Sequence, residues 1–150
     1  LTPSILSGDL SKDAMAPAVP IFVRAFRAPV TPARLRAVRE ALLAEAMVHG
    51  FSQELAWSLS AAADELLCNI EEHGTAGWME ISVEMGEHGA PLLRICDDGG
   101  LFDTAAAALK APGPAPHRER RLGLWMVQQF ARRLEHRRLP GGANETLLTF

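Results

Sequence analysis

Glu65, Asn69 and His73 are spaced four residues apart, and Glu65 and Asn69 are of types that handle protons and metal ions. In a helix this spacing places the three side chains along one face, beside an apolar stripe. An amide oxygen suits Mg²⁺, and a carboxylate can accept a proton from a hydroxyl group or water. Polar groups at the border of a core need partners, which a ligand can supply. The alternative is a solvated acidic patch, because Glu71 and Glu72 follow in the same helix.

A second candidate is the acidic glycine turn Asp97-Asp98-Gly99-Gly100, which follows an apolar segment typical of a strand. A carboxylate at the end of a strand can accept a hydrogen bond from an amino group, such as the exocyclic amine of adenine. Glycines allow the backbone to approach a flat ring closely. The alternative is an ordinary Asp-Gly turn without a ligand.

The third candidate is Gly123 in Leu122-Gly123-Leu124, where a helix is expected to begin after a long irregular segment. The free backbone N–H groups at the start of a helix form a natural site for phosphate. Arg118, Arg120 or Arg121 could add positive charge to such a site. The alternative is a simple junction between a loop and a helix.

His73 and the two cysteines have simpler explanations. His73 precedes Gly74, and a histidine in the last turn interacts favourably with the helix C-terminus while glycine caps it. Cys68 and Cys96 are flanked by apolar residues, so they are predicted to be small residues of the core. Two cysteines do not make a disulfide framework, and with His73 they lack the paired spacing of a zinc site.

The composition predicts one globular domain. The 150 residues are 48% hydrophobic and carry a formal net charge of −3, which gives no general reason to expect nucleic acid. Neither a membrane-length apolar run nor a signal peptide is evident, so a reduced, cytoplasmic setting is expected. Arginines gather in the last third, either on a solvated surface or at a site for phosphate or an acidic partner: Arg118, Arg120, Arg121, Arg132, Arg133, Arg137 and Arg138.

The elements that must position these residues follow from hydrophobic periodicity and turn signals. Residues 1–20 are expected to form an extended arm before a domain at 21–150. Amphipathic helices are expected at 32–48, 52–73 and 122–134, the last with Trp125, Val127 and Phe130 in the core. Strands are expected at 21–27, 78–85, 91–96, 134–139 and 145–150, with a lid at 98–120. This order predicts a two-layer α+β sandwich, in which a mostly antiparallel sheet carries helices on one face.

Together, the three candidate stretches resemble the sequence boxes of the GHKL (Bergerat-fold) ATPase superfamily. Within it, residues 21 to 150 are most similar to the anti-sigma factor serine/threonine-protein kinases of the RsbW and SpoIIAB type. Glu65-xxx-Asn69-xxx-His73 resembles the N box of that family. Asp97-x-Gly99-x-x-Phe102-Asp103 resembles the G1 box, and Leu122-Gly123-Leu124 resembles the second half of the G2 box. Thr146 stands where the family has a late threonine.

The resemblance implies a site for ATP and Mg²⁺ and a role for each matched residue. Glu65 would be the general base, and Asn69 would be the Mg²⁺ ligand. Asp97 would hold the adenine, while Gly123 and Leu124 would line the phosphates. The other matched residues would complete the nucleotide site: His73, Gly99, Phe102 and Thr146.

The resemblance also implies a reaction and partners. The reaction would transfer the γ-phosphate of ATP to a serine or threonine of a STAS-domain anti-anti-sigma factor. The second activity would be sequestration of a sigma factor or another regulatory protein. The sequestered protein and the STAS-domain protein would compete for the same kinase. The family usually works as a homodimer, and neither nucleic acid nor a membrane is an expected partner.

Two departures from the family pattern keep a second function open. The G2 box normally begins with glycine two positions before Gly123, where this chain has Arg121, and the lid is Pro/Ala-rich rather than Gly-rich. A side chain at 121 would crowd the phosphates or contact them itself. The alternative is a nucleotide-binding switch protein with weak or no kinase activity that sequesters a partner. The ATP-binding half of a histidine kinase ranks last, because the chain is too short for a phospho-accepting helical hairpin.

Overall fold

A computed structural model describes residues 20–27, 29–73, 75–100, 123, 125–129 and 131–150. Its five strands form one sheet in the order β1-β2-β3-β5-β4, and every neighbouring pair is antiparallel. The strands are β1 (Pro20–Arg27), β2 (Trp78–Met85), β3 (Pro91–Asp97), β4 (Arg133–Arg138) and β5 (Asn144–Thr149). The helices are α1 (Pro32–Val48), α2 (Gln53–His73) and the 3-10 turn η1 (Glu87–Gly89), and residues 123 and 125–129 are also helical.

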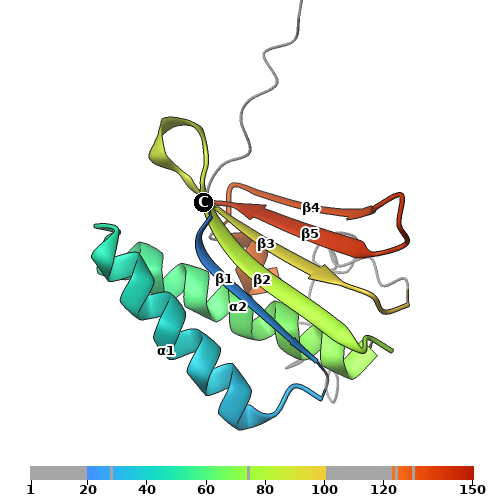
Figure 1. The fold of residues 1–150 in the computed structure, drawn as a ribbon. Helices are drawn as coiled ribbons and strands as arrows, with labels where there is room; N and C mark the ends of the chain where they lie inside the picture. Colours follow the sequence, from blue (N-terminus) through green and yellow to red (C-terminus); the bar gives the residue numbers. More distant parts are fainter. Residues whose placement is uncertain (1–19, 28, 74, 101–122, 124, 130) are drawn as a thin grey trace, which may run out of the picture.

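Helices α1 and α2 cover one face of the sheet, which confirms the predicted two-layer α+β sandwich (Figure 1). Along each strand, alternate side chains point into this layer and meet the apolar stripe of α2. Each large aliphatic side chain buried there stabilises the fold by about 1.5–3 kcal/mol relative to an exposed one. The side chains with 2% exposure or less include Leu42, Leu59, Leu66, Leu67, Met79, Ile81, Val83, Leu93, Ile95 and Leu148.

Both long helices begin at the predicted caps. The Thr31 hydroxyl accepts a hydrogen bond from the Arg34 N–H at 3.2 Å, and Pro32 occupies the first turn of α1. The Ser52 hydroxyl accepts one from the Leu55 N–H at 3.2 Å at the start of α2. Between the helices Gly50 has a φ of +78°, a left-handed conformation that favours glycine.

The helix predicted at 122–134 is wrong at its C-terminal end, because β4 already begins at Arg133. The Ala131 N–H still bonds the carbonyl of Val127 in a helical manner, but the Arg132 N–H donates to the carbonyl of Thr149 at 2.7 Å. From there β4 pairs with β5 along its whole length. Pairing β5 satisfies a row of backbone groups that a longer helix would leave open, so tertiary pairing overrides local helix preference.

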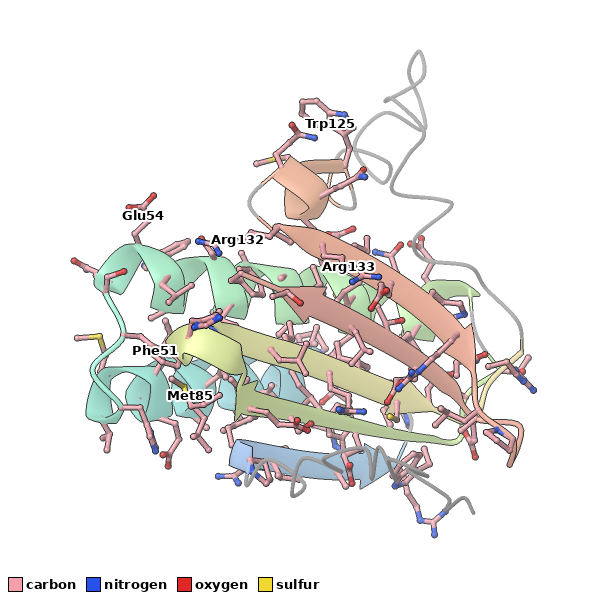
Figure 2. All side chains as sticks on the ribbon, turned by 90° about the horizontal axis from the view of Figure 1, so that it is seen from above. Phe51, Glu54, Met85, Trp125, Arg132 and Arg133 are labelled. Carbon is pink, nitrogen blue, oxygen red and sulfur yellow. The ribbon has the colours of Figure 1, made fainter. Side chains whose placement is uncertain are left out.

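Two predictions about the core also need correction. Cys68 is exposed and Cys96 is only half-buried, and both are free thiols. Burial raises the pKa of Cys96 to about 11, so this thiol stays protonated at neutral pH. Val127 is buried as predicted, whereas Trp125 is partly exposed and extends away from the sheet (Figure 2). Among the described residues, no helix combines the length and apolar character needed to span a membrane.

Candidate functional site

Helix α2 brings Glu65 and Asn69 into direct contact. The Asn69 Nδ2 atom donates to the Glu65 carbonyl and to Glu65 Oε1, both at 2.7 Å. Because both neighbours are acceptors, Nδ2 must face Glu65, and Asn69 Oδ1 must face the other way. Asn69 is buried with 5% exposure, yet no described residue bonds its Oδ1. This oxygen therefore has the chemistry and the freedom that a Mg²⁺ ligand needs.

The Glu65 carboxyl group is suited to accept a proton. Burial raises its pKa, the hydrogen bond from Asn69 lowers it in part, and the negative charges of Asp64 and Glu72 raise it further. A carboxylate with a raised pKa is a stronger base, so it takes a proton from a hydroxyl group more readily. The hydrogen bond from Asn69 also fixes its orientation.

Gly123 lies directly against this carboxyl group, although 58 positions of sequence separate the two residues. A Cβ atom added to Gly123 would collide with the carboxyl carbon and both oxygens of Glu65. Only glycine fits there without moving Glu65. The structure thus brings Gly123 of the third candidate stretch onto Glu65 of the first.

Asp97 is held inside the molecule by neutral donors. Its Oδ1 atom accepts from the Gly99 N–H at 2.9 Å and from Asn144 Nδ2 at 3.0 Å, and its side chain is buried. In the described part of the chain no hydrogen bond reaches Oδ2, which stays available to an amino group. A Cβ atom on Gly99 would lie 2.9 Å from Asp97 Oδ1 and 3.0 Å from the Ala76 nitrogen, so a side chain does not fit there either.

Asn144 and Arg138 complete this corner, and sequence reasoning missed both. Asn144 Nδ2 also donates to the carbonyls of Gly99 and Gly100, at 3.2 and 3.0 Å. Arg138 Nη1 donates to Asn144 Oδ1 at 2.8 Å and to the Gly99 carbonyl at 3.2 Å. The glycine turn is therefore fastened to β5 and β4. The one available signal was alternation along β5, which places Asn144 on the same face as Thr146.

Thr146 lies in the middle of β5 and faces the helices. It pairs with Ile95 on β3 and with His136 on β4, and its Oγ1 lies 3.1 Å from His136 Nδ1. It is therefore on the same sheet face as Asp97, two positions from Asn144. His136 was not among the predicted site residues.

Asp98 turns the opposite way from Asp97. Its Oδ1 accepts from the N–H groups of Gly77 and Trp78 at 2.8 and 2.9 Å, and these backbone bonds lower its pKa. It fixes the start of β2 and is exposed. Of the two adjacent carboxylates, only Asp97 faces the site.

Some predicted site residues cannot be placed. Phe102 and Leu124 lie outside the described residues, as do Arg121 and residues 101–120 of the predicted lid, and the side chain of His73 is not described. The structure brings together Glu65, Asn69 and Gly123 on one side, and Asp97, Gly99 and Thr146 on the other. Helix α2 packs against β3, and the last turns of α2 lie at the end of the sheet where β3 ends (Figure 1).

Comparison with known proteins places this arrangement in a family. The model of the family described as "Histidine kinase-like ATPase domain" matches residues 28–150. A comparison with curated protein sequences gave no significant match.

Two solved structures share the fold. In the SiaB–SiaC complex from Pseudomonas aeruginosa, the matched chain has a TM-score of 0.60 at 14% identity, over 85% of this chain and 88% of that one. The structure of the RsbU and RsbW domains of Rv1364c from Mycobacterium tuberculosis gives a TM-score of 0.57 at 16% identity, over 85% of this chain. The chain spans only 31% of that longer protein.

Proposed function

Because the chain belongs to the family of histidine kinase-like ATPase domains, we propose that it is a nucleotide-binding regulator that uses ATP to phosphorylate a partner protein. The observation that carries the proposal is the contact between Glu65, Asn69 and Gly123. A carboxyl group that can accept a proton, the amide of Asn69 and a helical glycine meet there, an arrangement suited to phosphoryl transfer.

The base of the nucleotide would bind at the other corner of the site. Asp97 Oδ2, which has no partner among the described residues, would accept the exocyclic amine of adenine, while Oδ1 is fixed by Gly99 and Asn144. The lack of a side chain at Gly99 lets the turn pack against Asp97 and Ala76, which holds Asp97 in place. Phosphates would extend from there toward Glu65 and Asn69 on α2, beside Gly123.

The proposed transfer needs one proton acceptor and no covalent enzyme intermediate. Glu65 takes the proton from a serine or threonine hydroxyl as the hydroxyl oxygen attacks the γ-phosphorus of ATP. The bond from the γ-phosphorus to the bridging oxygen breaks, and ADP leaves with the electron pair. Mg²⁺, when bound to Asn69 Oδ1, would neutralise charge on the phosphates. Asn69 thus serves both the base and the metal through opposite atoms of one amide.

The proposed partner is a STAS-domain anti-anti-sigma factor, within a partner-switching module that also sequesters a sigma factor or another regulatory protein. Support comes from the resemblance of the boxes and from the fold, which an RsbW domain and a chain of the SiaB–SiaC complex share. We further propose that the chain works as a homodimer.

The first test is isothermal titration with ATP, with and without Mg²⁺. Wild-type protein is expected to bind more tightly with Mg²⁺. Asn69→Ala should lose that Mg²⁺ dependence, and Asp97→Asn should weaken binding by about 10- to 100-fold, as for hydrogen bonds to charged groups. Asp98→Asn makes the same chemical change one residue away and should leave affinity unchanged. If wild-type protein fails to bind ATP at millimolar concentration, the nucleotide proposal is wrong.

The second test follows transfer of radiolabelled γ-phosphate to a purified STAS-domain protein from the same organism. Glu65→Gln should retain ATP binding and lose transfer by roughly 100-fold or more, as removal of a general base does. Undiminished transfer in Glu65→Gln would overturn the assignment of the base. Tight ATP binding without any transfer by wild-type protein would instead favour the switch protein that acts by sequestration.

A further inference from the structure

The helix-facing sides of β3, β5 and β4 form three cross-strand rows that change steadily in polarity. The outermost row, next to the glycine turn, is polar, the middle row is mixed, and the innermost row is apolar. From the turn inward, the rows are Asp97–Asn144–Arg138, Ile95–Thr146–His136 and Leu93–Leu148–Leu134. The polar row holds the glycine turn and the apolar row belongs to the core. In the middle row Ile95 is a core residue and Thr146 a predicted site residue, so His136 is the one without an assigned role.

His136 in the middle row carries an unpaired polar atom. Its Nδ1 lies 3.1 Å from Thr146 Oγ1, whereas its Nε2 is buried and has no hydrogen-bond partner among the described residues. A buried nitrogen of this kind costs free energy, because it gives up water without gaining a replacement. Such an atom is expected where a ligand supplies the missing partner.

We propose that His136 contacts the base of the bound nucleotide through Nε2, with Thr146 fixing its tautomer. The inference rests on the proposed nucleotide site and deepens it. Thr146 donates its hydroxyl proton to Nδ1, so the ring proton resides on Nε2. That N–H then donates to one of the acceptor nitrogens of adenine, N1, N3 or N7.

The position of His136 favours a contact with the adenine of the nucleotide over a contact with its phosphates. His136 is two strands from Asp97 and one row inward, and Thr146 lies between them on β5. Two residues along a strand span about 6.6 Å and neighbouring strands are about 4.8 Å apart, so side chains from both positions can reach one purine lying over β5. The groups suited to phosphates, Asn69 and Gly123, belong instead to the helix layer.

The test compares binding and stability in His136→Leu, which removes the nitrogen and keeps an apolar side chain. Affinity for ADP should fall about tenfold, the value of one buried hydrogen bond. The melting temperature without ligand should change little, because the unpaired Nε2 is gone while the buried Thr146 hydroxyl loses its contact with Nδ1. A merely structural histidine would lower stability and leave affinity alone. His136→Gln, whose amide can replace Nε2, should keep affinity within about threefold of wild type.

Two probes, ADP and adenosine, locate the contact by titration calorimetry. A contact to the base predicts the same fold-loss for both in His136→Leu. A loss for ADP alone would place the contact on the phosphates and overturn the proposal. His49→Leu, at the exposed C-cap of α1, is the control and should change neither affinity.

The remaining outcomes separate this inference from the proposed function. Wild-type protein that binds ADP, together with His136→Leu that binds equally well, would overturn the role of His136 alone. Wild-type protein that binds neither probe would overturn both. Should His136→Leu fail to fold, the Nε2 resonance of wild-type His136 in ¹⁵N-histidine spectra decides the matter. It must shift on addition of adenosine while that of His49 does not, and an unmoved resonance refutes the contact.

Discussion

Each face of the sheet buries one carboxylate, at neighbouring positions of the β3–β5 pair. The two carboxylates are held by different kinds of donor. On the helix-covered face Asp97 is held by N–H groups of Gly99 and Asn144, which are neutral. On the other face Glu145, only 2% exposed, is held by two guanidinium groups. Arg94 pairs with its Oε1 and Arg137 with its Oε2.

The difference separates a carboxylate that can serve a ligand from one that serves the fold. Glu145 has both oxygens occupied and its charge compensated, and Arg94 extends the network to Glu84 at 3.1 Å. Asp97 keeps one oxygen without a partner in the described residues, and no described cation pairs with it. Neutral donors fix its position without cancelling its charge, which leaves that charge for an incoming amino group.

The largest expected effect is on stability, from Glu145→Gln. Removing a buried charge leaves two guanidinium groups facing a neutral amide, and Arg137 is itself partly exposed. We expect a loss of about 2–3 kcal/mol in the free energy of unfolding, somewhat below the usual value for a fully buried pair. Urea unfolding measures it. ATP affinity should stay within about twofold, because the change is on the opposite face. An affinity loss as large as that of Asp97→Asn would mean that the two faces are coupled.

Asn144→Ala sharpens the comparison, because this residue should affect both stability and binding. It removes the amide that joins Asp97 to the carbonyls of Gly99 and Gly100. We expect a loss of about 1–2 kcal/mol in unfolding free energy and about a tenfold weaker affinity for ATP. Thr149→Ala lies on the same strand but faces the other side, and it should leave ATP affinity unchanged. A loss of stability without any change in ATP affinity would show that nucleotide binding does not depend on the hydrogen bonds from Asn144 to the glycine turn.

The part of the site on one helix could be predicted from sequence. Residues four apart in a helix must be neighbours, so the contact of Glu65 with Asn69 follows from spacing alone. The caps at Thr31 and Ser52 and the alternation of β2 are equally local signals. The matched family confirms the predicted superfamily.

The part of the site on β4 and β5 could not be predicted in the same way. Asn144 reaches Asp97 across 47 positions, and its bond depends on the register between β5 and β3. A one-residue change of register would turn Asn144 to the other face, and no local pattern fixes it. The same applies to Arg138 and His136, whose strand was partly predicted as helix. The role of Gly123 was expected toward phosphate, whereas its contact with Glu65 required the folded chain.

Gly123→Ala tests whether that contact is as close as the structure has it. Alanine in place of glycine normally stabilises a helix by up to about 1 kcal/mol. Here the added methyl group must displace the Glu65 carboxyl group, so we expect no gain in stability and about a tenfold loss of Mg·ATP affinity. The control is Gly141→Ala, where a Cβ atom would meet nothing within 4 Å. A stabilised variant with unchanged affinity would show that Glu65 and Gly123 are not in contact.

The smallest expected effect is a pH-dependent gain in stability from Glu65→Gln. Because burial raises the pKa of Glu65 above 4.5, the folded state binds this proton more tightly than the unfolded state does. The resulting stabilisation is complete below the unfolded pKa and is lost as pH rises through the folded one. At pH 7 the variant should therefore melt on the order of 1–2 °C above wild type, since the group is only half-buried. Melting curves between pH 4 and 8 should show the difference in melting temperature between the variant and wild type shrinking toward pH 4.

Glu54→Gln, on the exposed first turn of α2, controls for removing the charge itself. A wild type that melts above Glu65→Gln at pH 7 would mean that Asn69 stabilises the carboxylate more than burial disfavours it, and Glu65 would then resemble Glu145 rather than a base.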